Sequence, residues 1–101
     1  MSYDVTIGSV WINHTYNGAK EIQDVTGYNI NNFNELPGCV VYMMVDDMLK
    51  AIVKNRCELE KRMLQRYGSE LYYGTYDSWL DFLTRIKNTC KEHQFAEVII
   101  S

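Results

Sequence analysis

The side chains best suited to chemistry gather in one short polar stretch near the N-terminus. It offers amide, imidazole, hydroxyl and phenol groups from Asn13, His14, Thr15, Tyr16 and Asn17. Polar groups that follow a strand are a common place for a binding site. If the stretch stays extended, His14 and Tyr16 lie on one side and the other three on the opposite side. A ligand or partner site fits this pattern, and so does a structural role in capping a helix and satisfying loop backbone.

A second group of candidates is aromatic and lies in the last third of the chain. It contains Tyr72, Tyr73, Tyr76 and Trp79. Flat amphipathic rings can stack on a nucleotide base or anchor a protein partner. Basic side chains are sparse nearby, which argues against a nucleic-acid partner. We predict that Tyr73, Tyr76 and Trp79 contribute to the same binding function as residues 13–17, with packing around a helix start as the alternative.

The histidines and cysteines are few and scattered: His14, His93, Cys39, Cys57 and Cys90. They form no zinc spacing, and the chain has no glycine-rich phosphate loop and no nucleophile motif. We therefore predict no catalytic residue, no metal and no cofactor. An odd number of separated cysteines also favours a reducing cytosol over a disulfide framework. One enzymatic alternative stays open, the hydrolysis of a small phosphorylated molecule with His14 as acid or base.

Length and composition limit the class of protein. A chain of 101 residues with 47% apolar content is expected to fold as one domain, residues 1–101. A net charge of -3 gives no general attraction to nucleic acid or to an anionic membrane. No apolar run approaches the roughly 18 residues of a membrane span, and the acidic opening does not resemble a signal peptide. These features predict a cytoplasmic protein with neither nucleic-acid nor membrane partners.

Helical periodicity marks three segments. The longest runs from about residue 40 to residue 66, between a Pro-Gly pair and a glycine, with apolar side chains at steps of three, four and seven. A medium helix begins just after Thr75 or Asp77 and ends within residues 91–93. A short early helix over residues 19–26 follows Asn17, a candidate cap, and stops at a glycine.

Alternation of apolar and polar residues marks the strands. Residues 3–7 alternate in this way, residues 10–12 either extend that strand or return as a hairpin partner, and residues 96–100 form a last strand. The asparagine-rich segment 28–37 is expected to be an ordered loop. The prediction is an α+β fold, in which the two terminal strands pair in a small sheet packed on one long and one medium helix, with the short early helix beside them.

Several of these stretches resemble a family of small, largely uncharacterised proteins of phages and prophages. At the N-terminal end the resemblance rests on Tyr3-Asp4-Val5-Thr6-Ile7 and Asn13-His14-Thr15-Tyr16-Asn17. Towards the C-terminus it rests on Tyr73-Gly74-Thr75-Tyr76, Trp79-Leu80-Asp81-Phe82-Leu83, Cys90-Lys91-Glu92-His93 and Ala96-Glu97-Val98. The chain departs from the family pattern at Gln94, where a proline is usual, and at Tyr72-Tyr73-Gly74, where an asparagine-glycine-tryptophan-glycine run is usual.

The resemblance implies a setting and carries no established activity. It implies a small accessory protein acting in the cytoplasm of a bacterial host. Together with the two recognition-type clusters, it suggests a binding protein that inhibits a host defence component, either by blocking a host protein or by sequestering a nucleotide-like small molecule. An oligomeric structural or regulatory protein is the other alternative, and a homo-oligomer is expected in either case because two short terminal strands leave sheet edges exposed.

Overall fold

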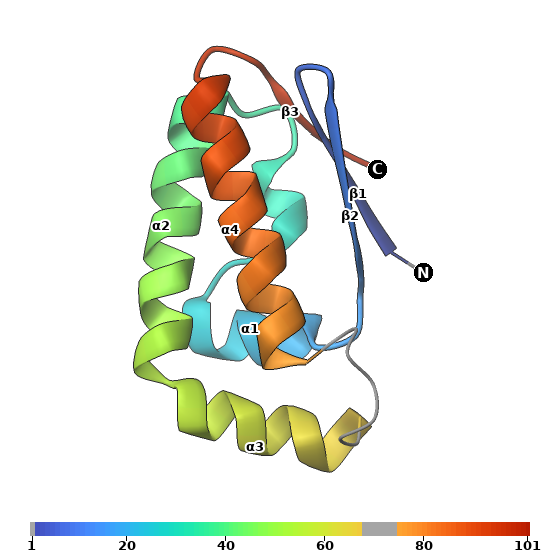
Figure 1. The fold of residues 1–101 in the computed structure, drawn as a ribbon, viewed down its shortest axis with the longest axis vertical. Coiled ribbons are helices and arrows are strands. Elements are labelled where there is room, and N and C mark those ends of the chain that lie inside the picture. Colours follow the sequence, from blue (N-terminus) through green and yellow to red (C-terminus); the bar gives the residue numbers. More distant parts are fainter. Residues whose placement is uncertain (1, 68–74) are drawn as a thin grey trace.

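The computed structural model describes residues 2–67 and 75–101, which form a small sheet and a layer of helices (Figure 1). In chain order the elements are β1 (Ser2–Ile7), β2 (Val10–Thr15), α1 (Ala19–Thr26), the 3₁₀ helix η1 (Ile30–Phe33), α2 (Gly38–Lys54), α3 (Arg56–Tyr67), α4 (Tyr76–Glu92) and β3 (Val98–Ile100). This arrangement confirms the predicted α+β class.

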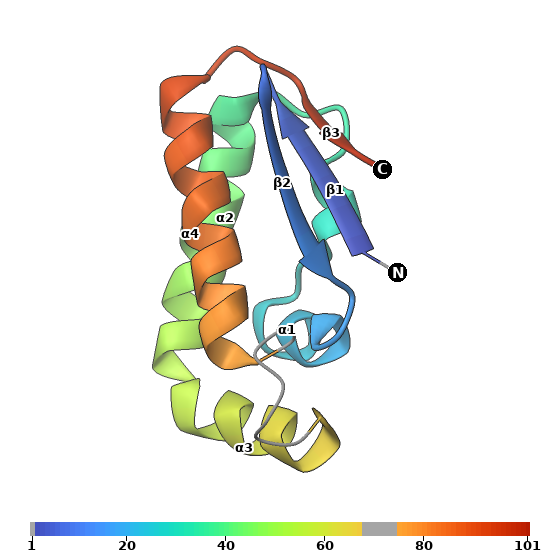
Figure 2. The same cartoon turned by 45° about the vertical axis from the view of Figure 1, so that its right-hand side comes forward.

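The sheet is antiparallel, with strand order β2-β1-β3. A two-residue turn joins β1 to β2, and its first residue, Gly8, has a φ of 61°, as a hairpin turn requires. The predicted pairing of the two chain ends is confirmed: Asp4 and Ser101 exchange backbone hydrogen bonds of 3.1 and 2.9 Å. The helices lie on one face of the sheet, and the other face is open among the described residues (Figures 1 and 2).

Helices α2 and α4 run antiparallel, side by side, under the sheet (Figure 2). The apolar stripe predicted for the first of them is buried, as is the stripe of α4. Both stripes meet the inward side chains of β1 in one core. Its largest fully buried members are Trp79, Phe33, Phe82, Ile7, Ile12, Ile22, Ile30, Met48, Ile52, Leu59, Leu83 and Ile86. Burial of this apolar surface is the main stabilising term of the fold.

The prediction of one continuous helix over residues 40–66 is wrong, because the chain breaks at Asn55. There the backbone leaves helical geometry (φ -106°, ψ 25°), and the Asn55 side-chain amide donates to the carbonyl of Ala51 at 2.8 Å. An unbroken helix of that length would span about 40 Å. Instead α3 turns across the end of the molecule and packs on α1 (Figure 1).

Two ion pairs join α3 to α1 after this turn. Arg62 pairs with Asp24 at 2.8 Å, and Arg66 pairs with the buried Glu21 at 2.9 Å. Sequence periodicity could not reveal the turn, since the apolar positions of α2 and α3 continue in nearly the same phase.

The short early helix has the predicted bounds, Ala19–Thr26, and ends at Gly27 with a φ of 80°. Its N-cap is Gly18, not the expected Asn17, and the cap makes no side-chain hydrogen bond. The asparagine-rich segment is ordered as predicted, because Asn29 and Asn32 form a reciprocal capping box around η1.

Candidate functional site

The predicted polar stretch divides between the two faces of β2. His14 points into the core and is 4% exposed. Its ring stacks on Phe82 (centroids 4.7 Å apart, planes 22° apart) and lies 4.4 Å from the Trp79 ring. The structure therefore brings two of the predicted site residues, one from β2 and one from α4, into direct contact inside the protein.

Both ring nitrogens of His14 have partners. Nδ1 lies 2.7 Å from the Thr15 carbonyl oxygen, and Nε2 lies 3.1 Å from Ser78 Oγ. A carbonyl only accepts, so Nδ1 carries a proton; the one hydroxyl hydrogen of Ser78 is shared between two acceptors, Nε2 of the neutral ring and the Thr75 carbonyl oxygen 3.0 Å away. Burial lowers the pKa of His14, which favours this neutral form; the Thr15 carbonyl and the charge of Asp81 act in the opposite direction.

A serine hydroxyl beside a histidine is also the arrangement of a nucleophile and its general base. Here, however, Ser78 is 3% exposed, and its hydroxyl also lies 3.0 Å from the Thr75 carbonyl. Thr75 is the N-cap of α4 and accepts from the Ser78 amide, so Ser78 belongs to the helix start. With both side chains buried, a substrate does not reach the pair in this conformation. The geometry serves packing.

The end of the polar stretch is tied to α4 as well. Trp79 Nε1 donates to the backbone carbonyl of Asn17 at 2.7 Å, and the backbone N–H of Asn17 donates to Thr15 Oγ1 at 3.3 Å. The Tyr16 ring lies 4.4 Å from the ring of Tyr3 and is partly exposed. These contacts fix the chain between β2 and α1, while the exposed side chain of Asn17 and the edge of Tyr16 stay at the surface.

The tyrosine candidates of the second cluster have different positions. Tyr76 is buried at the start of α4, with the guanidinium of Arg56 5.1 Å from its ring centroid. Burial raises the pKa of Tyr76. Tyr73 lies outside the described residues. Of the two predicted aromatic site residues that the structure describes, Tyr76 and Trp79, Trp79 is the one placed against the polar stretch.

Asn13 points away from the core, onto the open face of the sheet. Its side-chain amide donates to Asp4 Oδ1 at 2.9 Å, to Ser2 Oγ at 3.0 Å and to the Tyr3 carbonyl at 3.1 Å. Trp11 Nε1 donates to the same Asp4 oxygen at 3.1 Å, which holds an indole that is 62% exposed. Trp11 was not among the predicted site residues. The sequence did carry a signal for it, a tryptophan at a position of the strand where the alternation calls for a polar residue.

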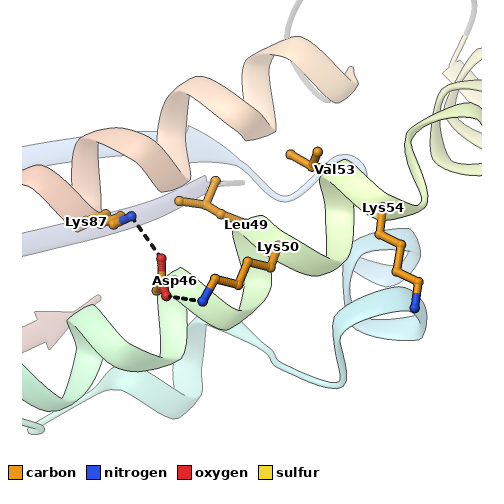
Figure 3. Close-up of a pocket in the computed structure, with 6 residues that line it drawn as sticks. All are labelled: Asp46, Leu49, Lys50, Val53, Lys54 and Lys87. Carbon is orange, nitrogen blue, oxygen red and sulfur yellow. Dashed lines mark hydrogen bonds and ion pairs between the residues drawn. The ribbon is translucent and has the colours of Figure 1, made fainter.

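A surface hollow of about 420 Å³ lies between α2 and α4 (Figure 3). Asp46, Leu49, Lys50, Val53, Lys54 and Lys87 line it. Lys50 and Lys87 point toward Asp46, at 3.0 and 2.9 Å, while Lys54 points away (Figure 3). The hydrogen bond from Lys87, with that from Lys50, lowers the pKa of the Asp46 carboxyl. The lysines are engaged as ordinary surface ion pairs, so this hollow is a weaker candidate than an exposed aromatic anchor.

The most exposed large apolar side chain of the described residues is Phe95, at 94%. It sits in the turn between α4 and β3, where the Ala96 amide donates to the His93 carbonyl at 3.2 Å. The carbonyls on either side of Phe95, those of Gln94 and Ala96, accept from the first amides of α2 at 2.8 Å each. The turn therefore caps α2 and holds Phe95 outward on a fixed backbone.

The first turns of α2, whose first two amides bond to this turn, carry further exposed apolar side chains. Val40 and Met43 are exposed one helical turn apart on α2. A second hollow, of about 260 Å³, is lined by Cys39, Tyr42, Lys91 and Gln94. We call the exposed ring of Phe95 on this turn the Phe95 patch. Sequence reasoning missed it, because Phe95 belongs to no periodic pattern; its signal was an aromatic between a helix end and a strand.

The chain has no match among protein-family models, curated proteins or solved structures. Within residues 2–67 and 75–101, no group of three or more His, Cys, Asp or Glu side chains could hold a metal ion. Among the described helices, none has the length and apolar character needed to cross a membrane.

Proposed function

We propose that this chain is a non-catalytic protein-binding protein whose anchor is Phe95. The observation that carries the proposal is the 94% exposure of Phe95 on a turn that is hydrogen-bonded to the start of α2. Aromatic side chains are enriched among the residues that dominate binding energy in protein interfaces.

The energetics favour such an anchor. Covering one fully exposed phenylalanine contributes about 1.5 to 3 kcal/mol. The turn is already held by the α2 amides through Gln94 and Ala96, so binding does not have to order its backbone. The aromatic ring itself has two rotatable bonds and loses little entropy. A rigid, exposed ring is therefore an efficient contact for a partner's pocket.

The surroundings of Phe95 supply a larger contact surface. Val40 and Met43 are exposed apolar side chains on the first turns of α2, and methionine adapts readily to differently shaped partners. The 260 Å³ hollow beside Gln94 offers a complementary depression for a partner side chain. Lys91, which lines this hollow, suits the polar rim of an interface.

The burial of His14 and Trp79 supports a protein partner over a nucleotide-like ligand. Stacking of a base on Trp79 and hydrogen bonding through His14 would require both side chains to leave the core. The resemblance to small phage and prophage proteins supports a host protein as the target, in the bacterial cytoplasm, and inhibition of that protein as the outcome.

The test is a quantitative pull-down from bacterial lysate with the purified protein as bait. The informative variant is Phe95→Ser, and the matched control is Leu64→Ser, which removes an apolar side chain that is 55% exposed on α3. Any protein that the wild type enriches is then purified and titrated. We expect the Phe95→Ser change to weaken its binding about 30-fold or more, the effect of losing an anchor worth about 2 kcal/mol.

The proposal fails if Leu64→Ser and Phe95→Ser reduce binding equally, or if neither does. Recovery of a stoichiometric nucleotide from the denatured wild-type protein, with no enriched protein, would favour the sequestering alternative instead. Turnover of such a molecule would favour the hydrolase alternative.

A further inference from the structure

The two outer edges of the sheet differ in whether another segment forms hydrogen bonds with them. The outer edge of β3 is covered by the segment before α2: Val98 exchanges backbone hydrogen bonds with Glu35 and Leu36 at 2.7 and 2.8 Å, and the Ile100 amide donates to Asn34 Oδ1 at 2.9 Å. No described segment pairs with the outer edge of β2.

The pairing register identifies the backbone groups at that open edge. Asp4 exchanges both of its backbone hydrogen bonds with Ser101, so its N–H and C=O point toward β3. Asp4 is also the register partner of Asn13 on β2. In an antiparallel pair, residues opposite each other are either both bonded or both turned outward. The N–H and C=O of Asn13, and by the same alternation those of Trp11 and Thr15, therefore point away from the sheet.

The open edge lacks the usual protection against pairing. Natural edge strands carry lysine, proline or a bulge, or are short, to avoid contact with a second edge. β2 has the six residues Val10–Thr15, which include no lysine, arginine, acid or proline. It pairs with β1 without a bulge.

We propose that two copies of this chain join along β2, antiparallel, about a two-fold axis through Ile12. In this register Trp11 of one copy pairs with Asn13 of the other, and each such pair exchanges two backbone hydrogen bonds. All outward groups of Trp11 and Asn13 are then satisfied in both copies. The result is one continuous sheet with three strands from each copy, and both helical layers lie on the same side.

The competing register, about Asn13, is disfavoured by a contact already present. It would pair Trp11 with Thr15 of the second copy, so the Thr15 carbonyl, which already accepts from His14 Nδ1 at 2.7 Å, would have to accept a second hydrogen bond. In the register about Ile12 that carbonyl stays with His14. The two exposed Trp11 rings then lie diagonally across the axis, within reach of each other. A second copy thus covers an apolar ring that the monomer leaves in water.

Sedimentation velocity over roughly 1 to 200 µM protein tests the dimer. We expect a species of about twice the 11.8 kDa chain mass at the upper concentrations. Asn13→Lys places a charge at the edge, and Asn13→Pro removes an edge N–H while leaving the backbone hydrogen bonds between β2 and β1 intact. Both should shift the protein to monomer. Thr6→Lys is the matched control, since it adds the same charge to the same face on the central strand, and it should leave the dimer intact.

Amide hydrogen exchange followed by NMR tests the register. The amides of Trp11 and Asn13 should exchange at least tenfold more slowly in the dimer than in the Asn13→Lys monomer, while the Thr15 amide changes less. Circular dichroism confirms that each variant is folded. A monomer at every concentration overturns the proposal, and so does a dimer that survives both Asn13 changes. Because the Phe95 patch is not part of this edge, the pull-down can succeed or fail independently of this result.

Discussion

Replacing His14 with alanine distinguishes a core residue from a ligand-contacting one. The change removes both ring nitrogens and both aromatic contacts of a side chain that is 4% exposed. A core role predicts a large loss of folding stability. A binding role predicts loss of ligand with little change in stability.

The size of the loss can be worked from the contacts. The two hydrogen bonds, to the Thr15 carbonyl and Ser78 Oγ, contribute about 1 kcal/mol each. The contacts with Phe82 and Trp79 contribute about 0.5 to 1.5 kcal/mol each. The total, about 3 to 5 kcal/mol, lies in the range of large-to-alanine changes in protein cores. For a domain of this size it lowers Tm by about 12 °C or more.

The assay is urea unfolding at neutral pH, followed by tryptophan fluorescence, with Trp79 as the buried reporter. Asn13→Ala is the matched control: it is the neighbouring residue, but its hydrogen bonds lie on the exposed face, so its loss should cost less than about 1 kcal/mol. A His14→Ala cost below about 1 kcal/mol, or a larger cost for Asn13→Ala, would refute the reasoning.

Three further predictions concern pH, thiol reactivity and packing. Because burial lowers the pKa of His14, the unfolded state binds the proton more readily than the folded state. The unfolding free energy should therefore be flat above about pH 7.5 and fall below about pH 6.5, by at most about 1.4 kcal/mol per pH unit. In urea titrations the His14→Gln variant should lack this pH dependence. Burial raises the pKa of Cys90 to about 11, so a thiol reagent should modify the exposed Cys39 and Cys57 in the folded protein and reach Cys90 only on unfolding, as mass spectrometry of the labelled protein would record. In Gly38→Ala the new methyl would overlap the carbonyl oxygen at the end of α4, so the change should cost about 1 to 3 kcal/mol in urea unfolding.

Local periodicity predicted most of the fold because the elements are amphipathic. Residues 3–7 alternate between apolar and polar, and the apolar residues of α4 recur at steps of three and four. In each element these apolar residues form the one buried face. The break at Asn55 escaped this reasoning, since an asparagine is tolerated inside a helix and the apolar phase continues past it. The turn after α2 is accompanied by tertiary contacts: Arg62 and Arg66 of α3 form ion pairs with Asp24 and Glu21. These partners lie on α1, which is distant in the sequence.

The candidate site was predictable in part, for a related reason. Chemical type identified His14 and Trp79 as candidate binding residues but did not predict that the two segments meet; the structure places their rings in contact. Sequence alone does not give burial, and burial is what makes their contact a piece of the core. Phe95 is the most exposed aromatic side chain described, and its exposure depends on the position of one turn against α2, which the sequence does not give.

Site-specific photo-crosslinking in bacterial cells tests the central claim most directly. A benzoylphenylalanine at position 95 keeps an aromatic anchor in place, and the same group at position 64 is the control on an exposed site of α3. We expect one or a few discrete crosslinked host proteins from position 95, absent from position 64 and suppressed by excess wild-type protein but not by Phe95→Ser. The same products from both positions, or none from position 95, would contradict a protein partner anchored at Phe95.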